Sequence, residues 1–182
     1  MATKHFLGWV ERRAGSLRGM LSLHPRAALE PFDLAPSLNA TIIHLTDLDG
    51  LTREDAHQLL VADNESWSAG SIPLPGGRVG IMLNPTHART RIRATLMEEL
   101  AHIHLKHSPS QLIAVNGMAM RSFNKTHETQ AYWVGAAALM PLAVLEHAQA
   151  NGQQRNVVAR DFGVSPQLVG FRENVTGIRL PR

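Results

Sequence analysis

Apolar side chains recur at helical spacing in several stretches of the chain. The stretch around which the rest is arranged runs from Arg91 to His107, RIRATLMEELAHIHLKH. Within it, Ile92, Leu96, Leu100 and Ile103 recur at the spacing that lines one face of a helix. We therefore predict one helix over the whole stretch, with this apolar face buried and the charged and histidine side chains on its other faces.

The part of the chain before this helix is predicted to hold helices and strands in alternation. In order they are a helix from Lys4 to about Met20, a strand from Asn39 to Leu48, a short helix from Thr52 to about Ala62, and two strands, Trp67–Leu74 and Arg78–Leu83. Thr52 and Asp55 are spaced to form a capping box, and Pro75-Gly76-Gly77 is typical of a hairpin turn between the last two strands.

The part after the central helix is predicted to be helical beyond a long loop. The loop runs from Ser108 to Lys125, and a loop of that length inside a compact domain is usually functional. The helices expected after it are His127 to about Leu139 with Thr126 as N-cap, Pro141 to about Ala150, Asn156 to Phe162, and Pro166 to Glu173. Gly163 and Ser165 are placed to end and to begin the last two helices.

The central helix carries side chains that could bind a metal. Glu98 and His102 are four residues apart, so they share one face and lie about 6 Å apart along the axis. With Glu99 between them, they have the layout of the zinc-protease helix H-E-x-x-H, except that Glu98 stands where the first histidine belongs. On this segment alone, a solvated acidic face remains the alternative.

Composition narrows this chemistry. The chain has no cysteine, so any metal must be held by histidine and carboxylate. A helix-borne zinc site needs a further protein ligand, for which Glu128 in the first turn of the next helix is the natural candidate.

The formal net charge of +3 is spread along the chain and does not argue for nucleic acid. We see no signal peptide or membrane-spanning run, and expect a cytoplasmic protein without a membrane partner.

Several segments together resemble the ImmA/IrrE-type metallopeptidase family. They are RIRATLMEELAHIHLKH, GMAMRSFNKTHETQAYWVGAAALMP, ARDFGVSPQLVGFR and the hairpin end GIMLNP. The family shows H-E-L-x-H-x-x-L-x-H, then E-x-E-A-x-x-F-A-x-x-L-L-M-P, then A-x-x-F-x-V-S. The resemblance covers about Ala40 to Arg172. It departs at Glu98, at Gln130 in place of the second Glu, and at Val134 in place of the usual aromatic residue.

The resemblance implies a role for each matching position. His102 matches the second metal ligand, Glu128 matches the third, and Glu99 matches the general base that polarises the metal-bound water and protonates the leaving amine. Glu98 occupies the position of the first ligand. The changes at Gln130 and Val134 are expected to affect packing or outer hydrogen bonds more than the metal.

Glu98 leaves two readings of the site open. A carboxylate can bind Zn²⁺ at nearly the distance of a histidine nitrogen, which would give a site of two carboxylates and one imidazole. The ion in such a site would be a weaker Lewis acid, and the site would bind harder ions such as Mn²⁺ more readily. The alternative is a site that has lost its metal. Because three carboxylates in one pocket repel one another, we expect the site to bind a cation, and Zn²⁺ is the ion that we expect before others.

The remaining polar residues near these positions are expected to be structural. His104 is predicted to be exposed on the opposite face, His107 to cap the helix and His127 to lie on the surface. Tyr132 is expected to pack in the core, although its hydroxyl could donate a hydrogen bond to a reacting oxyanion. Arg91 and Arg93 are expected to be solvated.

These points predict an α+β, zincin-like fold in one domain over residues 1–182. A small, twisted, mainly antiparallel sheet with the first helix would occupy about 1–84, the metal-site helices 85–150 and a small helical tail 151–182. A cleft between the sheet edge and the central helix would take an extended peptide.

We expect a metal-dependent endopeptidase, and the resemblance implies that its substrate is a helix-turn-helix repressor or antitoxin in phage or stress-response control. The alternative is a degenerate peptidase kept as a binding or regulatory module. That module could contact DNA through its last two helices, near Arg160, Gln167 and Arg172, although direct nucleic-acid binding is the weaker expectation.

Overall fold

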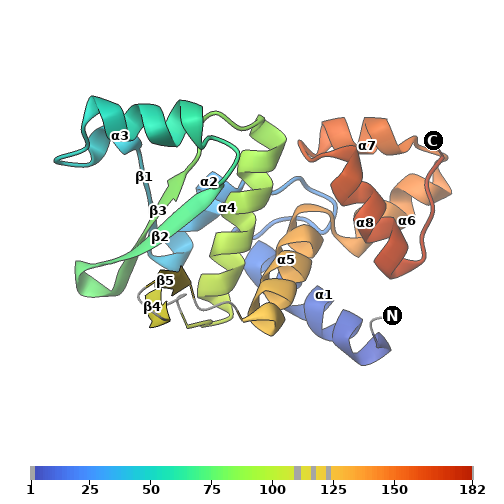
Figure 1. Cartoon of the computed structure of the whole chain (residues 1–182). Coiled ribbons are helices and arrows are strands. Elements are labelled where there is room, and N and C mark those ends of the chain that lie inside the picture. Colours follow the sequence, from blue (N-terminus) through green and yellow to red (C-terminus); the bar gives the residue numbers. More distant parts are fainter. Residues whose placement is uncertain (1–2, 109–111, 116–117, 122–123, 182) are drawn as a thin grey trace.

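The central helix lies between a small sheet and a group of helices, as a computed structural model shows (Figure 1). The structure describes residues 3–108, 112–115, 118–121 and 124–181, with backbone alone in 112–115 and 118–121. The central helix is α4 (Arg89–His104), with α5 (Lys125–Leu139) and α1 (Lys4–Gly19) on the side away from the sheet. The predicted α+β class is confirmed.

The sheet has three strands in the order β1-β3-β2, with β1 (Ala40–Ile43), β2 (Ala69–Leu74) and β3 (Arg78–Leu83). β2 and β3 are antiparallel, as the hairpin predicted, but β1 pairs with β3 in parallel, so the sheet is mixed. The turn η4 (Pro75–Gly77) needs its glycines, because Gly76 and Gly77 have φ of 76° and 72°. β2 therefore forms one edge of the sheet beside α4.

The first strand ends earlier than predicted. The sequence predicts a strand as far as Leu48, but β1 stops at Ile43 and is followed by the 3₁₀ turn η2 (Leu45–Asp47). The Asp47 carboxylate accepts a hydrogen bond from the His44 backbone N–H at 3.1 Å and so closes the turn. A local side-chain bond of this kind competes with continued strand pairing.

The other helices fall close to their predicted positions. They are α3 (Arg53–His57), η3 (Gln58–Ala62), α6 (Leu142–Ala150), α7 (Arg155–Asp161) and α8 (Pro166–Thr176). The short helices α2 (Pro31–Leu34) and η1 (Ala35–Leu38) lie around a proline-broken stretch, Pro25–Pro36, in which the sequence predicts one short helix at most. Thr52 and Asp55 form the predicted capping box, and Ser165 caps α8 by accepting from the Leu168 N–H. Gly163 has a φ of 61°, as expected between two helices.

Two helix ends differ from the prediction. α4 ends at His104 rather than at His107, and Lys106 adopts a left-handed conformation with φ of 56°. α5 is capped by Asn124 and not by Thr126, because the Asn124 side-chain oxygen accepts from the N–H groups of Thr126 and His127 at 3.0 and 3.2 Å. Asparagine is among the best N-cap residues, and this one satisfies two free amides of the first turn.

The predicted loop from Ser108 to Lys125 contains two short strands. β4 (Leu112–Val115) and β5 (Met118–Arg121) pair antiparallel with each other. In the sequence, Asn116-Gly117 separates these two apolar segments, and such a dipeptide between apolar runs is a strong hairpin signal. The prediction of a loop over the whole of this stretch was therefore wrong for these eight positions.

The core that positions the functional residues lies between α4 and α5. Buried side chains from the two helices are Leu96, Met97, Leu100, Ala101, Ala131, Val134, Ala137 and Ala138. Gly135 allows the close approach, because a Cβ on it would lie 3.3 Å from the backbone C and O of Met97. The small residues of α5 therefore bring its first turn against the polar face of α4.

Among the described residues, no single helix is long and apolar enough to cross a membrane; α5 and α6, bent by 47° relative to each other, pass that test only when joined.

Candidate metal centre

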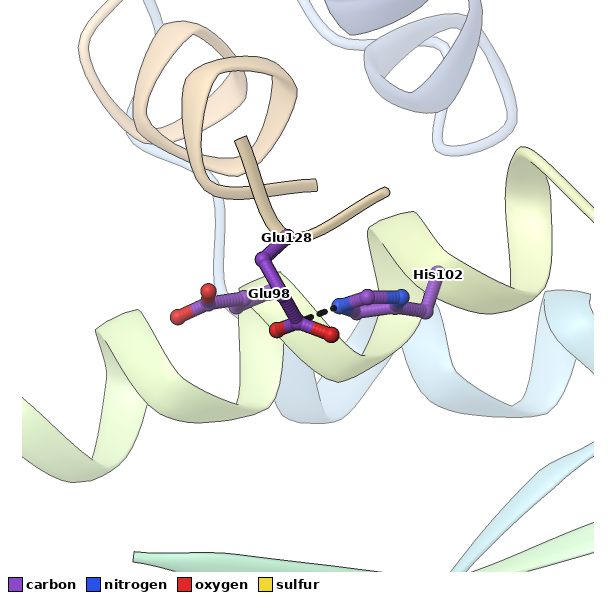
Figure 2. A group of neighbouring side chains, drawn as sticks. All are labelled: Glu98, His102 and Glu128. Carbon is purple, nitrogen blue, oxygen red and sulfur yellow. Dashed lines mark ion pairs between the residues drawn. The ribbon is translucent and has the colours of Figure 1, made fainter. Parts of the chain in front are cut away.

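Three predicted side chains meet where the first turn of α5 crosses α4. Glu98 and His102 come from α4 and Glu128 from α5 (Figure 2). Each offers one ligand atom, and these atoms all lie within 4.8 Å of one another. The His102 Nε2 lies 3.5 Å from the Glu128 Oε2, and all three residues are half-buried.

The positions of these side chains follow from one local and one long-range cause. Glu98 and His102 share a face of α4 because they are one helical turn apart. Glu128 reaches that face because α5 starts at the Asn124 cap and packs tightly on Met97 at Gly135, about two turns further along. The helical spacing of Glu98 and His102 can be predicted from the sequence, whereas the packing of α5 on α4 cannot.

The electrostatics of the group are those of crowded carboxylates. Burial, followed by the charges of Glu128 and Glu99, raises the pKa of Glu98 to about 7. The metal-free site thus holds either a proton on Glu98 or uncompensated negative charge at neutral pH. A divalent cation would remove that repulsion and displace the proton.

The donor set fits such a cation. Carboxylate and neutral imidazole are both zinc ligands, and three protein ligands with one free position are typical of a catalytic zinc site. Donors bonded tetrahedrally at roughly 2.0–2.2 Å would be about 3.4 Å apart. The three donor atoms now lie within 4.8 Å of one another, so small side-chain rotations would bring them to the spacing that a bound ion requires.

Glu99, between Glu98 and His102 in the sequence, contacts the edge of the sheet. The Ser71 hydroxyl, on the edge strand β2, donates a hydrogen bond to the Glu99 Oε2. Glu99 is still close enough for its charge to raise the pKa of Glu98. The predicted base therefore lies between α4 and β2, at the side of the site where an extended chain could approach the sheet edge.

Behind His102, the structure brings together side chains that were expected to be structural or on the surface. His107 caps α4 as predicted, because its backbone N–H donates to the His102 carbonyl at 3.0 Å. Its side chain also reaches the site: the Nδ1 lies 3.1 Å from the His102 Nδ1, and the Nε2 lies 3.0 Å from the Gln130 Oε1. His127 is not a free surface residue, because its ring stacks on His107 with centroids 4.2 Å apart. The pKa of His107 is lowered, chiefly by burial of its ring.

Two more expectations change at the periphery. Tyr132 packs on Phe171 with ring centroids 4.9 Å apart, but 39% of Tyr132 is exposed, so it is not a core residue. Burial and the charge of Glu98 raise the pKa of its hydroxyl. His104 is half-buried rather than exposed, and its Nε2 has no hydrogen-bond partner among the described residues. Burial and then Arg13 lower the pKa of His104.

Neither arginine before the ligands belongs to the site. Arg91 donates to Glu65 and Ser68 at 3.0 and 3.1 Å. Arg93, expected to be solvated, is buried and donates to Glu30 at 2.5 Å and to the Leu29 carbonyl at 2.7 Å. It therefore ties α4 to the chain that precedes α2.

The C-terminal helices are partly built into the core. Arg172 is completely buried and donates to the Met140 carbonyl and to Glu11 at 2.9 and 2.5 Å. It therefore cannot contact DNA in this structure, whereas Arg160 and Gln167 are exposed. DNA binding through this tail stays an untested prediction. Of the three polar residues proposed for it, only Arg160 and Gln167 are accessible.

A helix that carries two candidate ligands one turn apart, completed by a glutamate from the next helix, is the arrangement of helix-borne peptidase metal centres. Residues 58–174 match the family model Peptidase_M78, described as the IrrE N-terminal-like domain. The match spans more than half of the chain and includes the segments that carry Glu98, Glu99, His102 and Glu128, so the protein belongs to this family. Comparisons with curated proteins and with solved structures gave no match.

Proposed function

We propose that the protein is a metal-dependent endopeptidase whose ion is held by Glu98, His102 and Glu128. The observation that carries the proposal is the convergence of these three donors within 4.8 Å, beside a further carboxylate, Glu99, directed at a sheet edge. Family membership supports the same reaction class. We favour Zn²⁺, with Mn²⁺ as the alternative that two carboxylates would tolerate.

The bound ion would act as a Lewis acid toward the scissile carbonyl and lower the pKa of the attacking water. The chain itself supplies the proton transfer. Glu99 accepts the proton of the attacking water and returns it to the leaving amine, as a general base and then a general acid. Ser71 engages one oxygen of Glu99 and leaves the other for this transfer.

The substrate is proposed to be an extended segment of a protein. β2 pairs with β3 alone among the described strands, so its outer edge presents backbone groups beside Glu99. An extended peptide can add to such an edge by main-chain hydrogen bonds. The resemblance described above supports a cytoplasmic helix-turn-helix repressor or antitoxin as that protein.

The metal content of the protein tests the site first. Protein purified without chelator or immobilised metal should contain about one ion per chain by elemental analysis. His102→Ala should lose the ion and Glu98→His should keep it. Glu99→Gln should retain the ion but no longer cleave a co-expressed partner, because it removes only the base. Cleavage by Glu99→Gln would refute the assigned role.

The second candidate function is a binding module without catalysis. It is favoured by one observation, the pKa of Glu98 near 7, since a protonated Glu98 can donate a hydrogen bond in place of binding a metal. This candidate predicts a chelator-insensitive partner complex and no cleaved product. A gel time course with and without chelator separates the two candidates.

A further inference from the structure

The geometry points to a directed hydrogen-bond chain, His102–His107–Gln130, that holds His102 in the tautomer able to bind a metal through Nε2. His107 and Gln130 are then positioning residues that act through His102. Only the effect of the chain on metal binding rests on the proposed function, because the tautomers themselves can be measured in metal-free protein.

The direction of the chain follows from which atoms can donate. The Gln130 Oε1 is an amide oxygen and only accepts, so the His107 Nε2 at 3.0 Å must carry a proton. The other nitrogen of a neutral His107, Nδ1, is then an acceptor. The His102 Nδ1, 3.1 Å away, must therefore carry the proton of that contact. This leaves the lone pair of His102 on Nε2, the atom that faces Glu128 at 3.5 Å.

The reverse direction is the competing arrangement. If the Gln130 amide donated through its nitrogen, His107 would donate from Nδ1, and His102 would carry its proton on Nε2. That proton would occupy the atom that must bind the ion, and metal binding would require the whole chain to reverse. The two arrangements thus predict opposite tautomers at both rings.

The ring of His107 is held in place from two sides. It stacks on His127 at an interplanar angle of 3° and meets His102 edge-on at 75°. These contacts join the end of α4 to the first turn of α5. The orientation of the acceptor for His102 is thereby set by packing as well as by hydrogen bonds.

A neutral acceptor at position 130 suits a site that already holds three carboxylates. A carboxylate there would also accept from His107, but it would add a fourth negative charge near Glu98, Glu99 and Glu128. Gln130 provides the acceptor oxygen without the charge. The same reasoning makes Gln130→Glu the variant that keeps the direction of the chain.

Long-range ¹⁵N–¹H NMR of metal-free protein, at a pH chosen so that the spectra show neutral imidazoles, measures the tautomers directly. The expected result is a proton on Nδ1 of His102 and on Nε2 of His107. A proton on Nε2 of His102 in the parent protein would overturn the inference. Since no ion is needed, this outcome is independent of whether the protein binds metal or cleaves anything.

Variants then test the consequence. His107→Phe keeps a ring to stack on His127 but removes the acceptor, so His102 should shift to the Nε2–H tautomer and the Kd for Zn²⁺ should rise about 10- to 100-fold. Gln130→Glu should preserve both tautomers, whereas Gln130→Leu should lose them. An unchanged His102 tautomer in folded His107→Phe would also overturn the inference. Failure of the parent to bind Zn²⁺ with the expected tautomers present would refute the proposed function alone.

Discussion

Substitution of Glu98 by glutamine should change the pH dependence of stability in the metal-free protein. Glutamine has the shape of a protonated glutamate but cannot ionise. The pKa of Glu98 is raised in the folded protein from 4.5 to about 7, chiefly by burial. The folded state therefore holds the proton more tightly than the unfolded state, and Glu98 favours folding most when it is protonated.

The size and the sign follow from linkage. Below pH 4.5 the proton is bound in both states, between pH 4.5 and 7 it is bound only in the folded state, and above pH 7 in neither. The free energy of unfolding therefore falls as the pH rises through this window, by about 3 kcal/mol in total at about 1.4 kcal/mol per pH unit. Between pH 5 and pH 8, about 2–3 kcal/mol of this should be lost.

The assay is urea denaturation of parent and Glu98→Gln protein at pH 5 and pH 8, both in chelator. Every other titrating group is common to the two proteins, so the difference between their pH dependences isolates Glu98. The parent should lose about 2–3 kcal/mol relative to the variant as the pH rises. Equal pH dependences within about 0.5 kcal/mol would refute the assigned environment of Glu98.

Three further predictions concern the same site. Because a proton on Glu98 competes with the ion, Zn²⁺ affinity measured by calorimetry should fall up to about tenfold per pH unit below pH 7, and a flat profile from pH 6 to 7 would contradict this. Gly135→Ala should lower the free energy of unfolding by about 1–3 kcal/mol, because the added methyl meets the α4 backbone. Its control is Gly15→Ala in α1, where nothing lies within 4 Å and the change should stabilise or be neutral; equal effects would count against tight α4–α5 packing. Ser71→Ala should lower kcat of partner cleavage without changing metal content, since it frees Glu99 to take other orientations; an unchanged kcat would show that this bond plays no part.

Several differences between sequence prediction and structure share one cause, which is competition between local signals and partners far away in the chain. Arg93 was expected to be solvated as a charged residue, but its guanidinium is buried and donates to Glu30 and to the Leu29 carbonyl, more than 60 positions earlier in the chain. β1 reads as a strand from its own residues, yet its parallel pairing depends on where β3 lies. The β4–β5 hairpin is a different case, because its Asn-Gly signal was present in the sequence.

The sequence by itself determined the helix that carries Glu98 and His102, because helical periodicity places residues four apart on one face whatever surrounds them. It also determined that any metal must be held without thiolate, since the chain has no cysteine. Only the tertiary structure decided that Glu128 completes this group, that Glu99 meets Ser71 on the sheet edge, and that Glu98 is buried enough to raise its pKa. These properties depend on how α5 and β2 pack against α4, and such long-range packing is the summed result of many contacts that no local pattern records.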